Sequence, residues 1–147
     1  MRFGLVSLVF VSLLSWPGSD KAVGQSSGKK TLHSFLAVKK GAKRTNTFSA
    51  DAPTICAFWE SENLALGDTI GVVWIAEDVG AASPKATEIR RANYRVFKQE
   101  QVGEFSLSRP GNKTWPVGRY RVELYINGAI ADIMKFTINP GVTIETH

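Results

Sequence analysis

The stretch that decides the fold is Gly118-Arg-Tyr-Arg-Val-Glu-Leu-Tyr-Ile-Asn-Gly-Ala-Ile-Ala-Asp-Ile-Met-Lys-Phe-Thr-Ile-Asn139. At its centre, Asn127-Gly128 supplies the positive φ angles that a tight β-hairpin turn requires, so the segments on either side, 118–127 and 129–139, are predicted to pair as strands. Before the turn, apolar residues alternate with polar ones, which predicts that one face lies in a core and the other in water. After the turn the alternation changes phase near Asp132, which predicts a β-bulge.

Five segments further upstream show the same period of two and are separated by Gly, Pro, Asn and Asp. They span residues 45–50, 54–60, 69–77, 89–98 and 103–108. Together with the hairpin they give seven strands in about 95 residues, the density of a two-sheet sandwich. No stretch has the period of a long helix. The sequence therefore predicts an all-β fold.

Two short motifs carry a family resemblance. Gly118-Arg119-Tyr120-Arg121-Val122 resembles the tyrosine corner of immunoglobulin-like sandwiches, in which a Tyr hydroxyl returns to the backbone. Leu66-Gly67-Asp68-Thr69-Ile70 resembles the turn that enters the second strand of such domains, and Trp74 follows as a core candidate. Residues 105–110 and 115–120 add to the likeness, which covers roughly residues 46–139. It implies an immunoglobulin-like, two-sheet antiparallel sandwich of the type found in exported bacterial proteins.

The resemblance departs from antibody-type domains at the cysteines, because the chain has only one, Cys56. A single cysteine excludes an intrachain disulfide, so Cys56 is expected to be a free thiol. Two interpretations stay open: a buried, inert thiol, and an exposed thiol that forms an intermolecular disulfide in an oxidising compartment.

The first 44 residues are predicted to lie outside the sandwich, which would span 45–147. Residues 1–24 have the short positive start, apolar run and small-residue end of a secretory signal peptide, with an uncleaved interfacial anchor as the alternative. We therefore expect export to the periplasm or the extracellular space. Residues 25–44 carry six Lys or Arg and no Asp or Glu, and are predicted to be a basic flexible linker or tail. Residues 45–147 carry ten basic and twelve acidic residues, so the net charge of +5 belongs to the chain's beginning and does not indicate a nucleic-acid surface.

The sequence contains few residues that could form a catalytic site. One of the two histidines, His33, falls in the expected tail, and the other, His147, is the last residue. The sequence contains no phosphate-binding loop and no cluster with metal-ligand spacing, so neither a metal nor a cofactor is expected. Two carboxylate pairs, Glu60/Glu62 and Glu77/Asp78, are retained as the basis of a less favoured hypothesis, a small carboxylate-dependent hydrolase.

The predicted binding site is a sheet face. In immunoglobulin-like topology the strands at 89–98 and 118–127 would be adjacent, and their outward residues would place Arg91, Arg95, Arg121 and Tyr125 on one exposed surface. Planar cations beside an aromatic ring suit carboxylate, phosphate or sugar contacts. The alternative is an ordinary solvated face on which these cations pair with Glu123. Arg109 and Trp115 are secondary candidates, although Trp115 beside Pro116 could instead fill the end of the sandwich.

The resulting hypothesis is a non-enzymatic, exported binding module that contacts an anionic protein or glycan surface, with the basic tail touching a membrane surface. An alternative is a structural or assembly role, in which an edge strand pairs with another chain. Asn112-Lys113-Thr114 is a glycosylation acceptor sequence on a predicted loop, and its occupancy depends on the host.

Overall fold

The computed structural model describes residues 28–99 and 101–141. The signal peptide expected at 1–24 lies outside the described residues. The described residues form eight strands and one short 3-10 turn, η1 (Gly80–Ala82). The strands are β1 (Thr31–Ala37), β2 (Thr47–Ser49), β3 (Thr54–Glu62), β4 (Thr69–Asp78), β5 (Thr87–Arg95), β6 (Val102–Ser108), β7 (Gly118–Ile126) and β8 (Ala129–Asn139).

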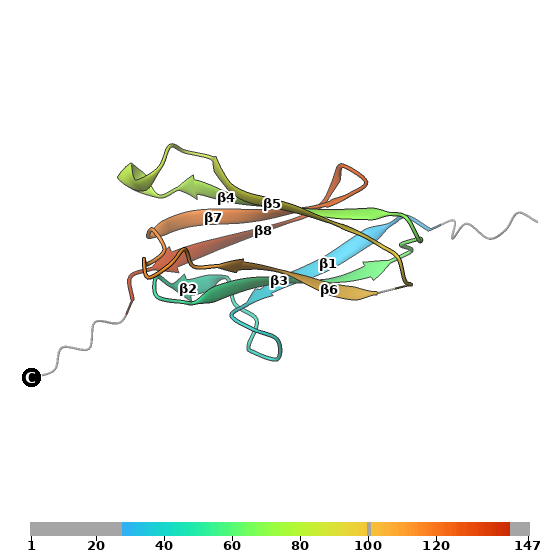
Figure 1. Cartoon of the computed structure of the whole chain (residues 1–147), viewed down its shortest axis with the longest axis horizontal. Helices are drawn as coiled ribbons and strands as arrows, with labels where there is room; N and C mark the ends of the chain where they lie inside the picture. The colour runs from blue at the N-terminus through green and yellow to red at the C-terminus, as the bar shows by residue number, and fades with distance from the viewer. Residues whose placement is uncertain (1–27, 100, 142–147) are drawn as a thin grey trace, which may run out of the picture.

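The strands form two sheets that pack face to face (Figure 1). One sheet has three strands in the order β1-β3-β6, and the other has five in the order β2-β8-β7-β4-β5. The predicted immunoglobulin-like two-sheet sandwich is confirmed, with eight strands instead of about seven. All pairings are antiparallel except one: β2 runs parallel to the end of β8, where a wholly antiparallel arrangement was expected.

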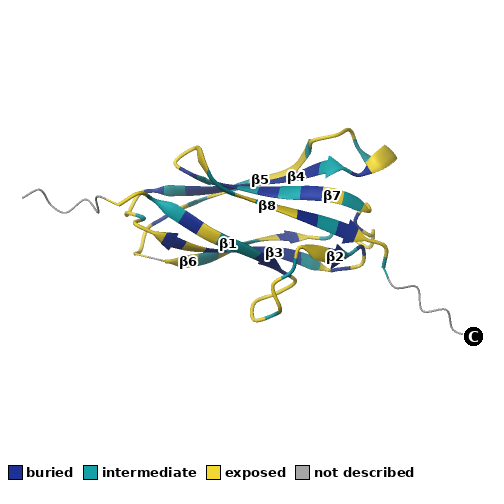
Figure 2. Ribbon diagram, turned by 180° about the vertical axis from the view of Figure 1, so that it is seen from behind, coloured by how far each residue is buried: buried dark blue, intermediate teal, exposed yellow. Residues whose placement is uncertain are grey.

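The inner faces of both sheets meet in one hydrophobic core, and Figure 2 shows buried and exposed residues alternating along the strands. Phe136 of β8 is a centre of this core, because its ring contacts those of Tyr120 at 5.2 Å, Phe48 at 5.6 Å and Trp74 at 6.4 Å between centroids. Trp74 is only 1% exposed, as expected of a core residue.

The tyrosine corner is present. Tyr120 lies in the core and its hydroxyl donates a hydrogen bond to the carbonyl oxygen of Pro116, four residues upstream. Burial raises the pKa of Tyr120 to about 12. Gly118, where β7 begins, has a φ of +152°, and a Cβ there would lie 2.2 Å from the carbonyl oxygen of Asp78. The sharp entry into β7 therefore requires glycine.

The hairpin between β7 and β8 forms as predicted. Asn127 and Gly128 have φ angles of 50° and 83°, the left-handed conformation at both turn positions. The register shifts where Leu124 pairs with Asp132 while Tyr125 pairs with Ile130, which leaves Ala131 as the extra residue of a bulge. The β-bulge predicted from the change in alternation near Asp132 is therefore confirmed.

One buried carboxylate, that of Asp68, connects three segments at the end of the sandwich next to this turn. Asp68 accepts hydrogen bonds from the backbone N–H of Ala65 at 2.7 Å, from the Lys30 ammonium group at 2.7 Å and from the Asn127 amide at 2.9 Å. Burial opposes ionisation, but these three donors prevail and lower the pKa of Asp68 to about 2. Asp68 thereby joins the segment before β1, the start of β4 and the β7–β8 turn.

The structure corrects the expected linker at 25–44, because β1 occupies Thr31–Ala37 within it. Leu32 and Leu36 point into the core, each 4% exposed, and β1 pairs along its whole length with β3. Phe35 points to the opposite face, where its ring stacks on Phe58 of β3 at 5.2 Å. The sandwich therefore begins at β1 instead of at residue 45.

Candidate functional site

The predicted binding face lies on the outer surface of the five-stranded sheet, but its strands are not neighbours. The expected adjacency of 89–98 and 118–127 is wrong, because β4 lies between β5 and β7. Across β4, Arg91 and Glu123 both pair with Val73, and Tyr125 pairs with Gly71. Arg91, Arg121 and Tyr125 therefore do share one face, separated by an apolar strand.

The cations on this face are mostly neutralised by acidic neighbours. Arg91 donates to Glu88 at 2.9 and 3.2 Å. Arg121 donates to Glu123 at 2.8 Å and to Glu77 at 3.4 Å, and the Tyr125 hydroxyl donates to Glu123 at 2.5 Å.

The pKa values on this face show the effect of these bonds. The hydrogen bond from Tyr125, with that from Arg121, lowers the pKa of Glu123, and the bond to Glu123 raises the pKa of Arg121. The pairing with Glu123 that the sequence offered as an alternative is thus present, and these charges are partly satisfied within the sheet.

A hollow of about 160 Å³ lies on the same face above Gly71. Arg91, Asn93 and Tyr125 line it, because Gly71 has no side chain to fill the space between its cross-strand neighbours. Arg95 is exposed, pairs with Thr69 at the end of the sheet, and forms no ion pair with any described residue. The structure therefore brings Arg91 and Tyr125 together around a small hollow, and leaves Arg95 and Arg121 outside it.

The two secondary candidates belong to the scaffold. Trp115 is 4% exposed and its indole Nε1 donates to the carbonyl oxygen of Ala52 at 2.7 Å, so it fills the end of the sandwich. Arg109 is half-buried and donates through Nη1 to the carbonyl oxygen of Asp51 at 2.9 Å. Both side chains therefore bind the backbone of residues 51 and 52.

Other residues singled out for chemistry are also engaged. Cys56 is buried on the outer face of β3, and burial, with the nearby charge of Glu104, raises the pKa of its thiol. Glu77 pairs with Arg121, while Asp78 pairs with Arg119 at 3.2 Å. Within residues 28–99 and 101–141, no group of three or more His, Cys, Asp or Glu side chains is arranged to hold a metal ion.

One surface feature does not follow from the sequence pattern, a projecting loop between β1 and β2. We call residues 38–46 the cationic loop, and it extends away from the sandwich in Figure 1. A backbone hydrogen bond from Thr45 N to Leu36 O, 2.9 Å long, closes its neck. A second, from Ala42 N to Lys39 O at 3.2 Å, forms its tip beside Gly41, whose φ is +80°. These bonds give the tip a defined shape.

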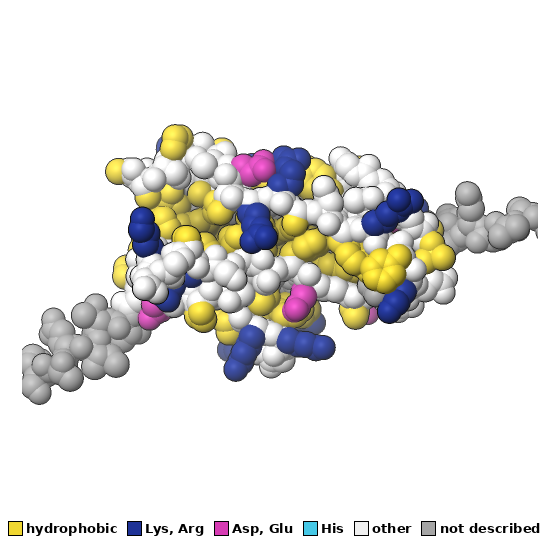
Figure 3. All heavy atoms as spheres, in the orientation of Figure 1, with side chains coloured by type: hydrophobic (Ala, Val, Ile, Leu, Met, Phe, Trp, Pro, Cys, Tyr) yellow, Lys and Arg dark blue, Asp and Glu magenta, His cyan; other side chains and the backbone are white. Residues whose placement is uncertain are grey.

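Four exposed cations occupy this loop: Lys39, Lys40, Lys43 and Arg44. The Arg44 guanidinium lies 3.9 Å from the centroid of the Phe35 ring, a cation–π contact. None of the four forms an ion pair with a described residue, and the loop contains no acidic residue. Figure 3 shows dark-blue side chains on this projection, below the body of the sandwich. The six-cation run in the sequence was the signal, but it was assigned to a tail without structure.

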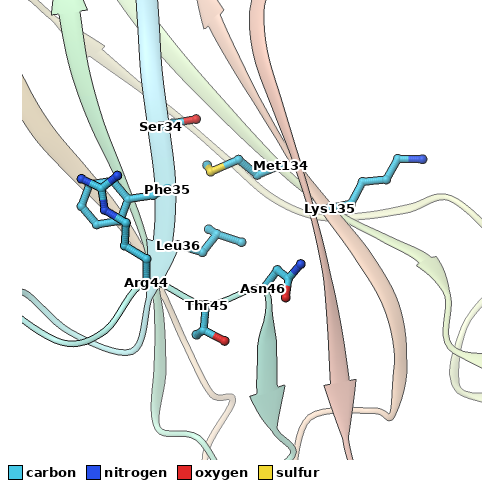
Figure 4. A pocket seen from close by; sticks show the side chains of 8 residues that line it. All are labelled: Ser34, Phe35, Leu36, Arg44, Thr45, Asn46, Met134 and Lys135. Atoms are coloured by element: carbon cyan, nitrogen blue, oxygen red, sulfur yellow. The ribbon is translucent and has the colours of Figure 1, made fainter.

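A groove of about 410 Å³ opens beside the cationic loop, between β1 and β8 (Figure 4). Ser34, Leu36, Asn46 and Met134 line its interior, while Lys135 lies on its β8 side and Arg44 lies on the far side of β1 over Phe35. The interior of the groove is therefore mostly neutral, and four cations of this region lie on the loop.

Comparisons with known proteins agree with the fold. A solved immunoglobulin-like protein from Pseudomonas aeruginosa matches with 11% identity and a TM-score of 0.49, over 76% of this chain and 93% of that one. The soluble domain of PmoD from a Methylocystis strain matches with 13% identity and a TM-score of 0.46, over 76% and 94%. A β-glucosidase from Listeria innocua matches with 14% identity and a TM-score of 0.51 over 82% of this chain, which corresponds to only 17% of the enzyme. The chain has an immunoglobulin-like β-sandwich fold, and these likenesses concern the fold alone.

No protein-family model matches the chain, and no curated protein is similar to it in sequence. Among the residues that the structure describes, no helix is long and apolar enough to cross a membrane.

Proposed function

We propose that this chain is a non-enzymatic, exported interaction module that attaches to an anionic surface of the cell envelope through the cationic loop. The observation that carries the proposal is the contrast between two sets of cations. Arg91 and Arg121 on the sheet face have carboxylate partners at 2.8–3.4 Å, whereas Lys39, Lys40 and Lys43 are exposed on a loop without acidic residues. Exposed cations that no carboxylate neutralises within the protein are available to bind an anionic partner.

The shape of the loop supports attachment to a surface. Because the loop projects from the sandwich, its cations reach an extended anionic layer before the body of the domain meets it. Arg44 is held against Phe35, so one cation is fixed at the base of the loop while the lysines lie nearer the tip. Arrays of phosphate or carboxylate groups, in lipid headgroups or in acidic polysaccharide, supply the matching chemistry.

Two further features are consistent with this role. The expected signal peptide at 1–24 would deliver the chain to the envelope. One of the two carboxylate pairs considered for hydrolysis is occupied, Glu77 by Arg121 and Asp78 by Arg119, and the other, Glu60 and Glu62, lies exposed on β3, which favours a non-enzymatic role over acid–base catalysis.

The test compares binding of the purified protein to vesicles of phosphatidylcholine, to vesicles with half of that lipid replaced by phosphatidylglycerol, and to polygalacturonate. We expect the triple variant Lys39→Ala/Lys40→Ala/Lys43→Ala to lose about 100-fold in affinity for the anionic partner, since each cation near such a surface contributes about 1 kcal/mol. The two anionic probes distinguish a lipid surface from a glycan surface.

A matched control removes the same charge elsewhere, in the variant Lys85→Ala/Arg95→Ala/Lys113→Ala, whose three residues are exposed away from the loop. Binding should survive this change. It should weaken steeply between about 0.05 and about 1 M salt, because screening of exposed charges becomes nearly complete over roughly this range. Equal losses in both triple variants would show that net charge alone drives binding and would refute the assignment to the loop.

A further inference from the structure

The two sheets expose four edge strands, and only one of them is long, regular and open. β2 has three residues, and β1 is held against β8 by a hydrogen bond from the Ser34 hydroxyl to Asp132. β5 carries a register shift against β4 and three arginines, features that discourage strand addition. β6 pairs with β3 over seven residues without any register shift, and it contains no Pro, Lys or Arg.

The hydrogen bonds at the two ends of β6 determine which of its residues direct their backbone N–H and C=O groups away from the sheet. Ser61 N donates to Gln101 O at 2.6 Å, and Arg109 N donates to Pro53 O at 2.9 Å, so residues 101 and 109 direct their backbone groups toward β3. Alternate residues share a direction in an antiparallel ladder, so residues 103, 105 and 107 also face β3. The N–H and C=O groups of Val102, Glu104, Ser106 and Ser108 therefore point away from the sheet, and no described strand pairs with them.

An aromatic groove of about 390 Å³ runs beside this edge, between β6 and the end of β5. Its lining comprises Trp59, Tyr94, Phe97, Gly103, Glu104 and Phe105. Phe97 is 65% exposed, although aromatic residues of this size are usually covered. Figure 3 views this side of the molecule and shows hydrophobic side chains along the gap between the two sheets.

A buried donor lies in the wall of this groove. Trp59 is 3% exposed, and its indole Nε1 has no hydrogen-bond acceptor among the described residues. The ring lies against Gly103 of β6, where a Cβ would come within 2.1 Å of it. A buried N–H without an acceptor destabilises the free protein, and an incoming oxygen atom that accepts this hydrogen bond would remove that cost.

The β5 side of the groove carries a cation, Lys98, whose ammonium group lies 5.7 Å from the centroid of the Phe97 ring. Arg90 projects from β5 on the same face as Tyr94. Both cations are exposed, and neither forms an ion pair within the described part of the chain. On β6, Glu104 is the single charged residue, and its side chain projects from the outer face beside Phe58. A segment lying along β6 would meet these cations across the groove, which favours acidic residues in that segment.

From these features we propose that β6 binds an extended acidic peptide segment of another protein. The peptide adds as a fourth strand to the three-stranded sheet, and its backbone pairs with the outward groups of Glu104 and Ser106. Alternate side chains of the peptide enter the aromatic groove, and an oxygen of the peptide accepts the Trp59 Nε1–H bond. The site is independent of the cationic loop, since β1 and β6 are opposite edges of the same sheet.

The test is selection of a phage-displayed library of random nine-residue peptides on the purified protein, followed by affinity measurement of the enriched peptides. We expect enrichment of sequences with an apolar residue flanked by Asp or Glu. Glu104→Pro removes an outward N–H without removing a bond to β3, and should weaken binding about tenfold, whereas Glu104→Ala keeps the N–H and should bind as the unchanged protein does. Phe97→Ala changes an exposed residue, so it should leave the fold intact and also weaken binding.

Nitrogen-15 NMR provides a second readout. On binding, the Trp59 Nε1–H resonance should move downfield as it gains an acceptor, while that of Trp115, already bonded to Ala52, should stay in place. Failure to enrich any peptide family, or equal affinity of the selected peptides for the Glu104→Pro variant, would overturn the proposal. Dimers of the unchanged protein that dissociate in this variant would assign the edge to a second copy of the chain instead.

Discussion

Replacing Asp68 by Asn removes the charge that holds together the end of the sandwich. The folded protein lowers the pKa of this carboxyl from about 3.9 to about 2, and a change of that size corresponds to about 2.5 kcal/mol of stability at pH 7. The partner Lys30 is 37% exposed, so water screens part of the interaction, and we expect Asp68→Asn to cost about 1.5 kcal/mol.

The pH dependence of this cost has a defined sign. A carboxyl whose pKa is lower in the folded state stabilises the protein above the unfolded pKa of about 3.9, and this contribution is lost as pH falls through about 2. The difference in unfolding free energy between the unchanged protein and Asp68→Asn, measured by urea denaturation, should therefore fall to about a third of its pH 7 value at about pH 2.5.

The control variant is Glu60→Gln, which removes one negative charge from an exposed position on β3. Its effect on stability should stay within about 0.5 kcal/mol. A difference for Asp68→Asn that is as large at pH 2.5 as at pH 7 would refute the reasoning, because the contribution would then not come from the ionised carboxylate.

Two substitutions and one measurement of thiol reactivity test the scaffold. Tyr120→Phe removes only the hydroxyl that bonds Pro116, and should lower the unfolding free energy by about 0.5–1.5 kcal/mol in urea denaturation; an unchanged midpoint would mean that the corner contributes nothing to stability. Gly118→Ala places a methyl group against the Asp78 carbonyl and should lower Tm by more than about 5 °C, a loss of over about 1 kcal/mol. The Cys56 thiol should react with iodoacetamide at least about tenfold more slowly in the folded protein than in urea, because burial raises its pKa; equal rates would contradict its burial.

The sequence predicts those parts of the fold that depend on neighbouring residues. The Asn127-Gly128 turn, the bulge after it and the inward placement of Tyr120 and Trp74 all follow from local pattern, and the structure confirms them. β1 was missed because its pattern is mixed: Ser34 faces inward while Phe35 faces outward. Phe35 is stabilised there by Phe58 and Arg44, two contacts that depend on the folded chain.

The candidate site was less accessible to sequence reasoning, because it depends on which strands are neighbours. Alternation correctly placed Arg91 and Tyr125 on an outer face, but the order of strands along the chain did not reveal that β4 separates them. The bond between Arg91 and Glu88 was also hidden, since a register shift in β5 brings these residues, three positions apart, to the same face. Charge pairing of this kind is decided by tertiary geometry.

The parallel ladder between β2 and β8 has a consequence for how the chain reaches its native state. Thr47 pairs with Thr137, ninety positions later, so β2 has no partner strand until almost all of the remaining chain is available. Bringing such distant residues together costs loop entropy before any contact compensates for it, and topologies of this kind fold in milliseconds to seconds. While Phe136 and Ile138 are still inside the ribosome, β2 of a nascent chain would stay unpaired and the Phe48 side chain would lack the aromatic ring that covers it in the folded domain.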